Sequence, residues 1–129
     1  MNYYTKLTPT VSIILPSGVE ERVTYIQFVN QLAKRDTPQL MKLHAALGVC
    51  GEAGELADAV KKECIYNKQV DRANIVEELG DLAFYKQFVM NLYSITDEEV
   101  LQGNADKLSK RYVGLAYSDN AAQQRVDKV

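Results

Sequence analysis

The chain has 129 residues, of which 47% are apolar, and it carries a net charge of −2 at neutral pH. This length suits one domain with a core of ordinary size, and the apolar content excludes a disordered acidic tail. A protein that coats nucleic acid is usually clearly basic, so we expect no nucleic-acid polymer as partner, whereas a small nucleotide stays open as a ligand. The apolar runs are too short to span a bilayer, and no signal peptide is evident, so we expect no membrane partner.

Residues 1–23 are expected to form an N-terminal extension to the main domain. The run VSIIL lies between two prolines, and PSG at 16–18 is a turn signal. These features favour either an irregular segment or a short β-hairpin with strands at Val11–Leu15 and Val19–Val23.

From Thr24 onward the apolar pattern becomes helical. Thr24 and Gln27 form the pair expected of a capping box, which predicts a first helix that ends near Asp36. Thr37 can cap a second helix, with Pro38 at its first position. Apolar and small residues then follow at steps of three or four along one face of this second helix: Leu40, Leu43, Leu47, Cys50, Ala53, Ala57, Val60 and Cys64.

The two cysteines are expected to be reduced core residues. On one helix, Cys50 and Cys64 would lie about 21 Å apart at about 1.5 Å per residue, which is too far for a disulfide within the chain. Reduced cysteines are typical of a cytoplasmic protein, and we therefore expect that location.

The rest of the chain predicts further helices with short connections. The expected elements are a polar connection at 67–73, a third helix at about 74–92, a fourth helix from the Thr96–Glu99 capping pair to about Tyr112, and a short fifth helix from Ser118. Helices joined in this way pack against their neighbours. We therefore expect an all-α fold, a bundle of four to five helices, in which residues 24–129 form a single domain.

Two acidic pairs carry the chemistry of this sequence. GEAGELADAVKK places Glu52 and Glu55 one helical turn apart, and EELGDLAFY places Glu78 and Asp81 at the same spacing. The third expected helix is apolar around most of its circumference, which is typical of a buried helix. A buried carboxylate without a partner costs several kcal/mol or takes up a proton, so we expect cations beside Glu78 and Asp81.

Antiparallel packing of the second and third helices would turn both pairs toward one space. Glu52, Glu55, Glu78 and Asp81 then form a set of oxygen ligands without histidine or cysteine, which favours Mg²⁺, with Mn²⁺ as an alternative. Four carboxylates carry more charge than one divalent ion needs, so we expect two or more ions in the site. Ions of this kind commonly hold substrate phosphates.

Glycines recur beside these acids. Gly48, Gly51 and Gly54 follow at intervals of three, and Gly80 lies within the second acidic pair. A glycine costs about 1 kcal/mol relative to alanine in a helix interior, so four of them need a reason. We interpret them as positions of close helix contact and as space for ions or phosphate.

Basic residues suited to a phosphate chain also occur. Lys61 lies at the end of the first acidic stretch, and NADKLSKRY spaces Asn104, Lys107 and Arg111 along one face of the fourth helix. Such a face can hold phosphate oxygens through charge-assisted hydrogen bonds. The alternative interpretation is an ordinary solvated face and, for Lys61, a basic residue that favours a helix C-terminus.

In this order and spacing, GEAGELADAVKK, EELGDLAFY and NADKLSKRY resemble the MazG-like all-α nucleoside triphosphate pyrophosphohydrolases over about residues 40–112. The resemblance implies Mg²⁺-dependent hydrolysis of a nucleoside or deoxynucleoside triphosphate to the monophosphate and pyrophosphate. It also implies assembly as a homodimer or homotetramer. The roles that it implies are metal ligation by Glu52, Glu55, Glu78 and Asp81, an additional catalytic acid at Glu77, and phosphate contacts at Lys107 and Arg111.

We expect Glu52 or Glu55 to orient the attacking water, with metal ions that neutralise the developing charge. Three other interpretations of the sequence differ from this one. A non-catalytic oligomerisation or adaptor module would need no complete ligand set, and all four acids are present. A di-iron bundle expects Glu-x-x-His motifs on two helices, and the chain has none. A narrower enzyme of the dUTPase or dCTPase type stays open.

Overall fold

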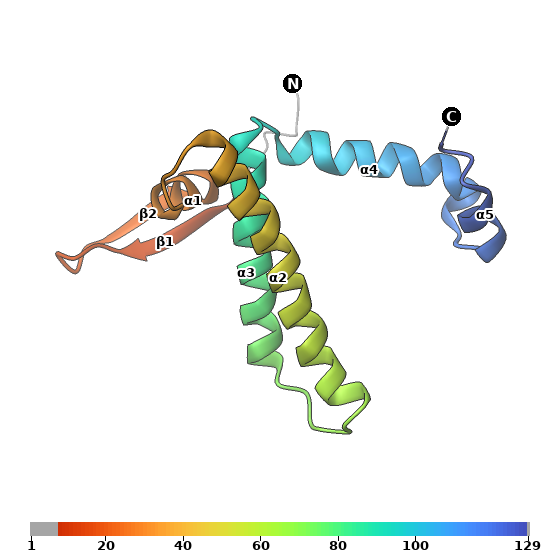
Figure 1. Ribbon diagram of the computed structural model, residues 1–129, viewed down its shortest axis with the longest axis horizontal. Coiled ribbons are helices and arrows are strands. Elements are labelled where there is room, and N and C mark those ends of the chain that lie inside the picture. The colour runs from red at the N-terminus through yellow and green to blue at the C-terminus, as the bar shows by residue number, and fades with distance from the viewer. Residues whose placement is uncertain (1–7, 129) are drawn as a thin grey trace. The chain divides into compact units, whose positions relative to one another are not determined.

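The computed structural model describes residues 8–128, in which the chain forms two compact units (Figure 1). The first unit ends at Tyr93 and the second begins at Ser94. These described residues contain five α-helices, one 3-10 turn and one two-stranded antiparallel sheet. The content confirms the expected all-α class. The part of the expected N-terminal extension that the structure describes, residues 8–23, takes the hairpin form, and residues 1–7 lie outside the described residues.

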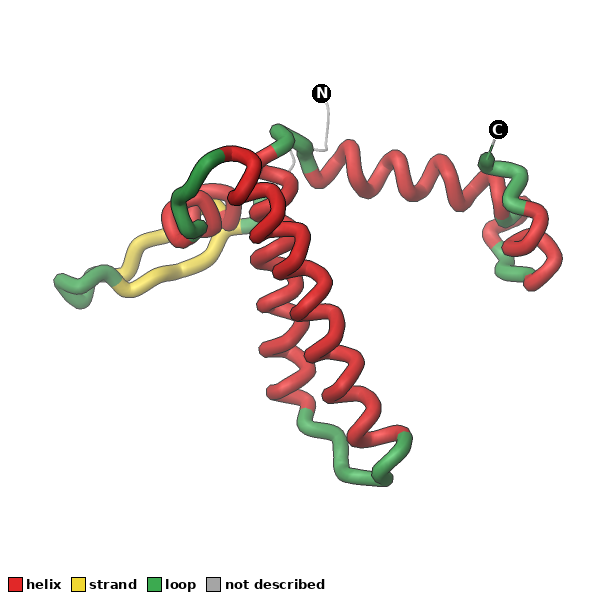
Figure 2. The backbone as a smooth tube through the Cα atoms, in the orientation of Figure 1, coloured by secondary structure: helices red, strands yellow, loops and turns green. Residues whose placement is uncertain are grey.

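The hairpin consists of β1 (Thr10–Ile14) and β2 (Glu20–Thr24), the yellow parts of the tube in Figure 2. Both strands lie one residue further from the turn than the sequence pattern predicted. The reason is that Leu15 and Val19 belong to the turn: the Leu15 amide donates to the Val19 carbonyl at 2.9 Å. Gly18 adopts φ +83°, a conformation that glycine tolerates and most residues avoid.

The first helix, α1 (Tyr25–Leu32), begins at the predicted capping box. The Thr24 hydroxyl accepts from the Gln27 amide, and the Gln27 side chain accepts from the Thr24 amide, both at 3.1 Å. The predicted helix end was wrong by four residues. The Arg35 guanidinium donates to the Asn30 carbonyl at 2.6 Å and satisfies one of the carbonyl groups that a helix end leaves free.

Two long helices follow, α2 (Pro38–Cys64) and α3 (Arg72–Leu92), and they lie side by side in opposite directions (Figure 1). The Thr37 hydroxyl caps α2 as predicted, through a 3.3 Å bond from the Leu40 amide. The third helix begins two residues earlier than predicted because Asp71 caps it. The first unit is therefore a helical hairpin that carries α1 and the β-hairpin.

The buried core lies where α1 meets α2 and α3. Its fully or nearly buried members come from α1, from the residue after it and from the two long helices: Val29, Ala33, Met41, Ala45 and Phe88. The aromatic side chains of Tyr25, Phe28, Phe84 and Tyr85 pack against them. This cluster fixes one end of the α2–α3 hairpin.

A polar network ties α1 to α3 beside this core. The Asn91 side chain donates to the Ile26 carbonyl at 3.2 Å and to the Asn30 side chain at 3.0 Å. The amide of Gln87, which is 7% exposed, donates to the Asn91 oxygen at 2.8 Å. Buried polar groups need such partners, so the network specifies how α1 sits on α3.

The outer surface of the long helices is apolar in places. Leu43 and Leu47 on α2 are 53% and 61% exposed, and Leu79 on α3 is 48% exposed. The expectation that Cys50 and Cys64 are core residues was wrong, since both are exposed free thiols. None of the helices within residues 8–128 combines the length and the apolar character needed to cross a membrane.

The second unit contains α4 (Asp97–Arg111), the 3-10 turn Val113–Leu115 and the short α5 (Asp119–Gln124). The predicted capping box at Thr96 is present, with both of its reciprocal hydrogen bonds. Ser118 caps α5 as predicted, by accepting from the amide three residues later at 3.1 Å.

Candidate metal centre

The two acidic pairs lie on facing helices of the first unit. Glu52 and Glu55 belong to α2, and Glu78 and Asp81 belong to α3. Each pair has one-turn spacing, so both of its side chains lie on one side of its helix, and the antiparallel hairpin opposes the two pairs. One carboxylate oxygen from each of Glu52, Glu78 and Asp81 lies within 4.8 Å of the others.

The negative charges of this cluster act on the carboxyl group of Glu78. Partial burial raises the pKa of the Glu78 carboxyl above its ordinary value, and nearby negative charges raise it further. Those charges belong, in decreasing order of effect, to Glu55, Asp81, Glu52 and Glu77. The folded chain therefore holds carboxylates closer together than their own repulsion favours, which is the electrostatic condition for cation binding.

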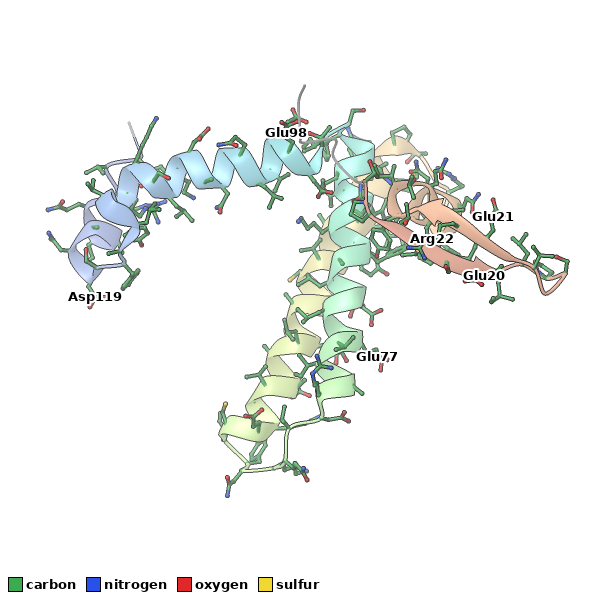
Figure 3. All side chains as sticks on the ribbon, turned by 180° about the vertical axis from the view of Figure 1, so that it is seen from behind. Glu20, Glu21, Arg22, Glu77, Glu98 and Asp119 are labelled. Carbon is green, nitrogen blue, oxygen red and sulfur yellow. The ribbon has the colours of Figure 1, made fainter. Side chains whose placement is uncertain are left out.

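The remaining two acids lie at the edge of the cluster. Glu55 is exposed and is not one of the three that converge, although its charge acts on Glu78. Glu77 is exposed, and Figure 3 shows its side chain turned away from α2. The sequence interpretation of Glu77 as a catalytic acid stays a prediction.

The glycines beside the acids differ from one another. A Cβ built at Gly48 would overlap the ring of Tyr85, so this position requires glycine for close contact between α2 and α3. Around Gly51, Gly54 and Gly80 a built Cβ meets nothing within 4 Å. The expected close helix contact thus occurs at Gly48, while open space surrounds the other three.

The donor set fits a hard divalent cation. The three converging groups offer carboxylate oxygens and are half-buried, half-buried and exposed in turn. Neither of the two cysteines lies in this group. Ligand sets that consist only of oxygen atoms favour Mg²⁺ or Mn²⁺ over metals that prefer thiolate or imidazole ligands. The crowding around Glu78 adds a direct reason for the site to attract positive charge.

Tyr25, the first residue of α1, is near enough to Asp81 to feel its charge. Partial burial raises the pKa of the Tyr25 hydroxyl, and the charge of Asp81 raises it further. Its ring stacks on that of Phe28 at 5.8 Å between centroids. Asp81 is 56 positions away in sequence, and no local pattern connects the two residues.

The predicted phosphate contacts lie in both units. The Lys61 ammonium, at the end of α2, is 5.5 Å from the centre of the Tyr66 ring. Asn104, Lys107 and Arg111 lie along α4, where Asn104 is exposed and the other two are half-buried.

Asp127 is a neighbour of Arg111 that the sequence did not reveal. It forms an ion pair with Arg111 at 2.6 Å within the second unit. The sequence predicted the short helix from Ser118, but no signal predicted where the residues after that helix would go.

A comparison with family models gives one match to this chain. The model described as the MazG nucleotide pyrophosphohydrolase domain matches residues 41–114, which is more than half of the chain. The matched segment contains both acidic pairs and the basic residues of α4. No curated protein and no solved structure matches the chain.

Proposed function

The chain belongs to the MazG nucleotide pyrophosphohydrolase family, and on that premise we propose that it hydrolyses a nucleoside or deoxynucleoside triphosphate with the aid of Mg²⁺. The products are the nucleoside monophosphate and pyrophosphate. Such a reaction clears or rebalances nucleotide pools.

One observation carries this proposal: oxygens of Glu52, Glu78 and Asp81 converge within 4.8 Å. We assign metal ligation to these three residues and to Glu55, whose charge already acts on Glu78. When bound there, Mg²⁺ supplies positive charge that offsets the charge developing on the phosphate oxygens.

We assign the attacking water to the acids of α2, with Glu77 as an additional catalytic acid. Glu52 or Glu55 orients the water and takes up its proton as its oxygen bonds to the α-phosphorus. The bond from this phosphorus to the bridging oxygen breaks, and pyrophosphate leaves with that oxygen. Support for Glu52 comes from its place in the converging group, and support for Glu55 comes from its exposure to solvent.

The triphosphate chain needs hydrogen-bond donors besides metal, and cationic donors suit it best. We propose Lys61, Asn104, Lys107 and Arg111 for this role. Three of them follow one another along α4, so their donors share one helix face. Arg111 also forms an ion pair with Asp127 in the second unit.

We propose that the protein is a homodimer or homotetramer. Leu40, Leu43 and Leu47 expose half or more of their surface and line an open hollow of about 310 Å³ at the start of α2. Val76 and Leu79 are about half exposed on α3. A second copy of the chain would remove this apolar surface from water, which is the main favourable term in association.

We place the protein in the cytoplasm, with no nucleic-acid polymer and no membrane as partner. Support for the location comes from Cys50 and Cys64, two exposed thiols that are not paired with each other. The net charge of −2 disfavours a nucleic-acid polymer.

The experiment that tests this function is pyrophosphate release across all ribo- and deoxynucleoside triphosphates and the diphosphates, with Mg²⁺ and with a chelator. We expect turnover of at least one triphosphate that disappears with the chelator. A chain without turnover on any substrate would instead be a non-catalytic module that has kept the fold.

A further inference from the structure

Arg111, a proposed phosphate contact, holds a carboxylate within its own unit. Its Nε donates to Asp127 Oδ1 at 2.6 Å, and its Nη2 donates to Asp127 Oδ2 at 3.0 Å. Two parallel bonds of this kind form the strongest arrangement in which arginine holds a carboxylate. Asp127 lies beyond the matched residues 41–114, so the family match assigns it no role.

A reversal of the chain brings Asp127 to the last turn of α4. Gly114 adopts φ +78° in the 3-10 turn, and α5 then lies beside the end of α4 (Figure 1). Arg125 ends α5 in the left-handed conformation, with φ +49°. Asp127 thereby reaches a residue 16 positions earlier in the chain.

The pair is almost removed from water. The Asp127 side chain is 1% exposed and that of Arg111 is 14% exposed. Hydrogen bonding from Arg111 is the main cause that lowers the pKa of Asp127 to about 2, and the charge of Lys107 acts in the same direction. Asp127 is therefore ionised at neutral pH, and the pair is formed before any substrate arrives.

Asp127 does not use every hydrogen-bond donor of the guanidinium. Arginine has five N–H donors, and Asp127 uses two of them. The Tyr112 hydroxyl is a further hydrogen-bonding neighbour of Arg111. The guanidinium therefore has donors that these two partners do not use, and Asp127 fixes their direction because it fixes the plane of the group.

We propose that Asp127 is a positioning residue, which holds the Arg111 guanidinium in the orientation that contacts the triphosphate chain. The inference rests on the proposed function, because it takes Arg111 as a phosphate contact. A guanidinium that is already held loses little further rotamer freedom when phosphate binds, so pre-organisation strengthens binding.

The test compares Asp127→Asn, Asp127→Glu and Arg111→Ala with the wild type. Two quantities are measured: the affinity for pyrophosphate in saturating Mg²⁺, by calorimetry, and kcat/KM for the best triphosphate substrate. We expect Asp127→Asn to weaken both by about tenfold, the loss typical of one charge-assisted contact, and Asp127→Glu to recover part of it. Adding Asp127→Asn to Arg111→Ala should cause no further loss, because Asp127 acts through Arg111.

A matched control is Asp119→Asn, which changes another aspartate of the same tail. Asp119 accepts a hydrogen bond from the Tyr117 hydroxyl at 2.9 Å and takes no part in the Arg111–Asp127 pair. Pyrophosphate affinity and kcat/KM of this variant should therefore keep their wild-type values. The melting temperature of every variant reports whether the second unit still folds.

Two results would overturn the positioning role. If Asp127→Asn lowers only the melting temperature and leaves pyrophosphate affinity unchanged, Asp127 merely anchors the tail. If the substitution tightens pyrophosphate binding, Asp127 competes with phosphate for Arg111. The proposed function fails in a different way, through absence of turnover by the wild type, and the binding measurement still reports on Asp127 in that case.

Discussion

Glu78 shows the energetic cost of the candidate metal centre at the scale of single residues. Its carboxyl is half-buried and surrounded by other acids, so its ionised form is disfavoured in the folded chain. Natural sites often give up stability for function in this way. The same crowding that destabilises the metal-free protein is what makes a divalent cation bind.

Neutralising one acid should therefore separate activity from stability. We expect Glu55→Gln and Asp81→Asn each to remove nearly all turnover and to leave the fold intact. Without metal, the melting temperature should stay the same or rise, because each change relieves repulsion on Glu78. Steady-state kinetics and thermal unfolding with a chelator measure the two effects.

Glu63→Gln is the control for these variants, since Glu63 is an exposed acid on the same helix. It should retain wild-type turnover. Near-normal activity in both Glu55→Gln and Asp81→Asn would rule out the assigned metal centre.

The pH dependence of stability gives a second test of Glu78. Its raised pKa means that the folded state holds the proton more tightly than the unfolded state does. The free energy of unfolding of the metal-free protein should therefore rise as pH falls from neutral through the raised pKa toward 4.5, the ordinary value. Urea unfolding with a chelator at several pH values measures this, and Glu78→Gln should lack this part of the pH dependence. An identical pH dependence of stability in the wild type and in Glu78→Gln would contradict the raised pKa of Glu78.

At the scale of elements, the helix starts could be predicted because a cap depends on residues within one turn. Thr24, Thr37, Thr96 and Ser118 each cap the helix that the sequence placed after them. The end of α1 could not be predicted in the same way. At this end the Arg35 side chain bonds to the Asn30 carbonyl, and nothing in the pattern fixes where that side chain turns.

The convergence of the acids was predictable for a similar reason. One-turn spacing on two helices joined by a short loop brings both pairs to one space, and three of the four acids do meet. The effect of the Asp81 charge on Tyr25 and the ion pair of Arg111 with Asp127 were not predictable. Both join segments whose approach is set by turns and packing rather than by local periodicity.

The close packing of α2 on α3 can be tested at Gly48. A methyl group there overlaps the Tyr85 ring, which packs against the core, so Gly48→Ala should cost about 1–3 kcal/mol through overpacking. Gly103→Ala on α4 is the control. Its surroundings are open, and it should be neutral or stabilise by up to about 1 kcal/mol. Chemical denaturation measures both, and equal effects would mean that the contact at Gly48 is not needed.

At the scale of the whole molecule, the distribution of apolar surface points to self-association. The α2–α3 hairpin has α1 against one end, and Leu43, Leu47 and Leu79 stay about half exposed or more. Surface leucines scattered singly are ordinary, but Leu43 and Leu47 lie one helical turn apart on α2 and line the same hollow, and grouped apolar surface of this kind favours a partner.

We expect the wild type to sediment as a dimer or a larger assembly at micromolar concentration. Leu43→Asp and Leu47→Asp should shift it toward a folded monomer, because a charge on this face opposes its burial. Leu101→Asp, at a 62% exposed position on α4, is the comparison that should leave the assembly intact. A stable, well-folded wild-type monomer in sedimentation would contradict the proposed assembly.

We propose that this chain cleaves a triphosphate between its α- and β-phosphorus atoms, and analysis of the products is the most direct test of that activity. Phosphorus NMR of a reaction with Mg²⁺ and the best triphosphate substrate follows every phosphorus species at once. We expect nucleoside monophosphate and pyrophosphate to accumulate in equal amounts, and neither to form with the Asp81→Asn variant. Accumulation of nucleoside diphosphate with orthophosphate, or equal product formation by wild type and variant, would contradict it.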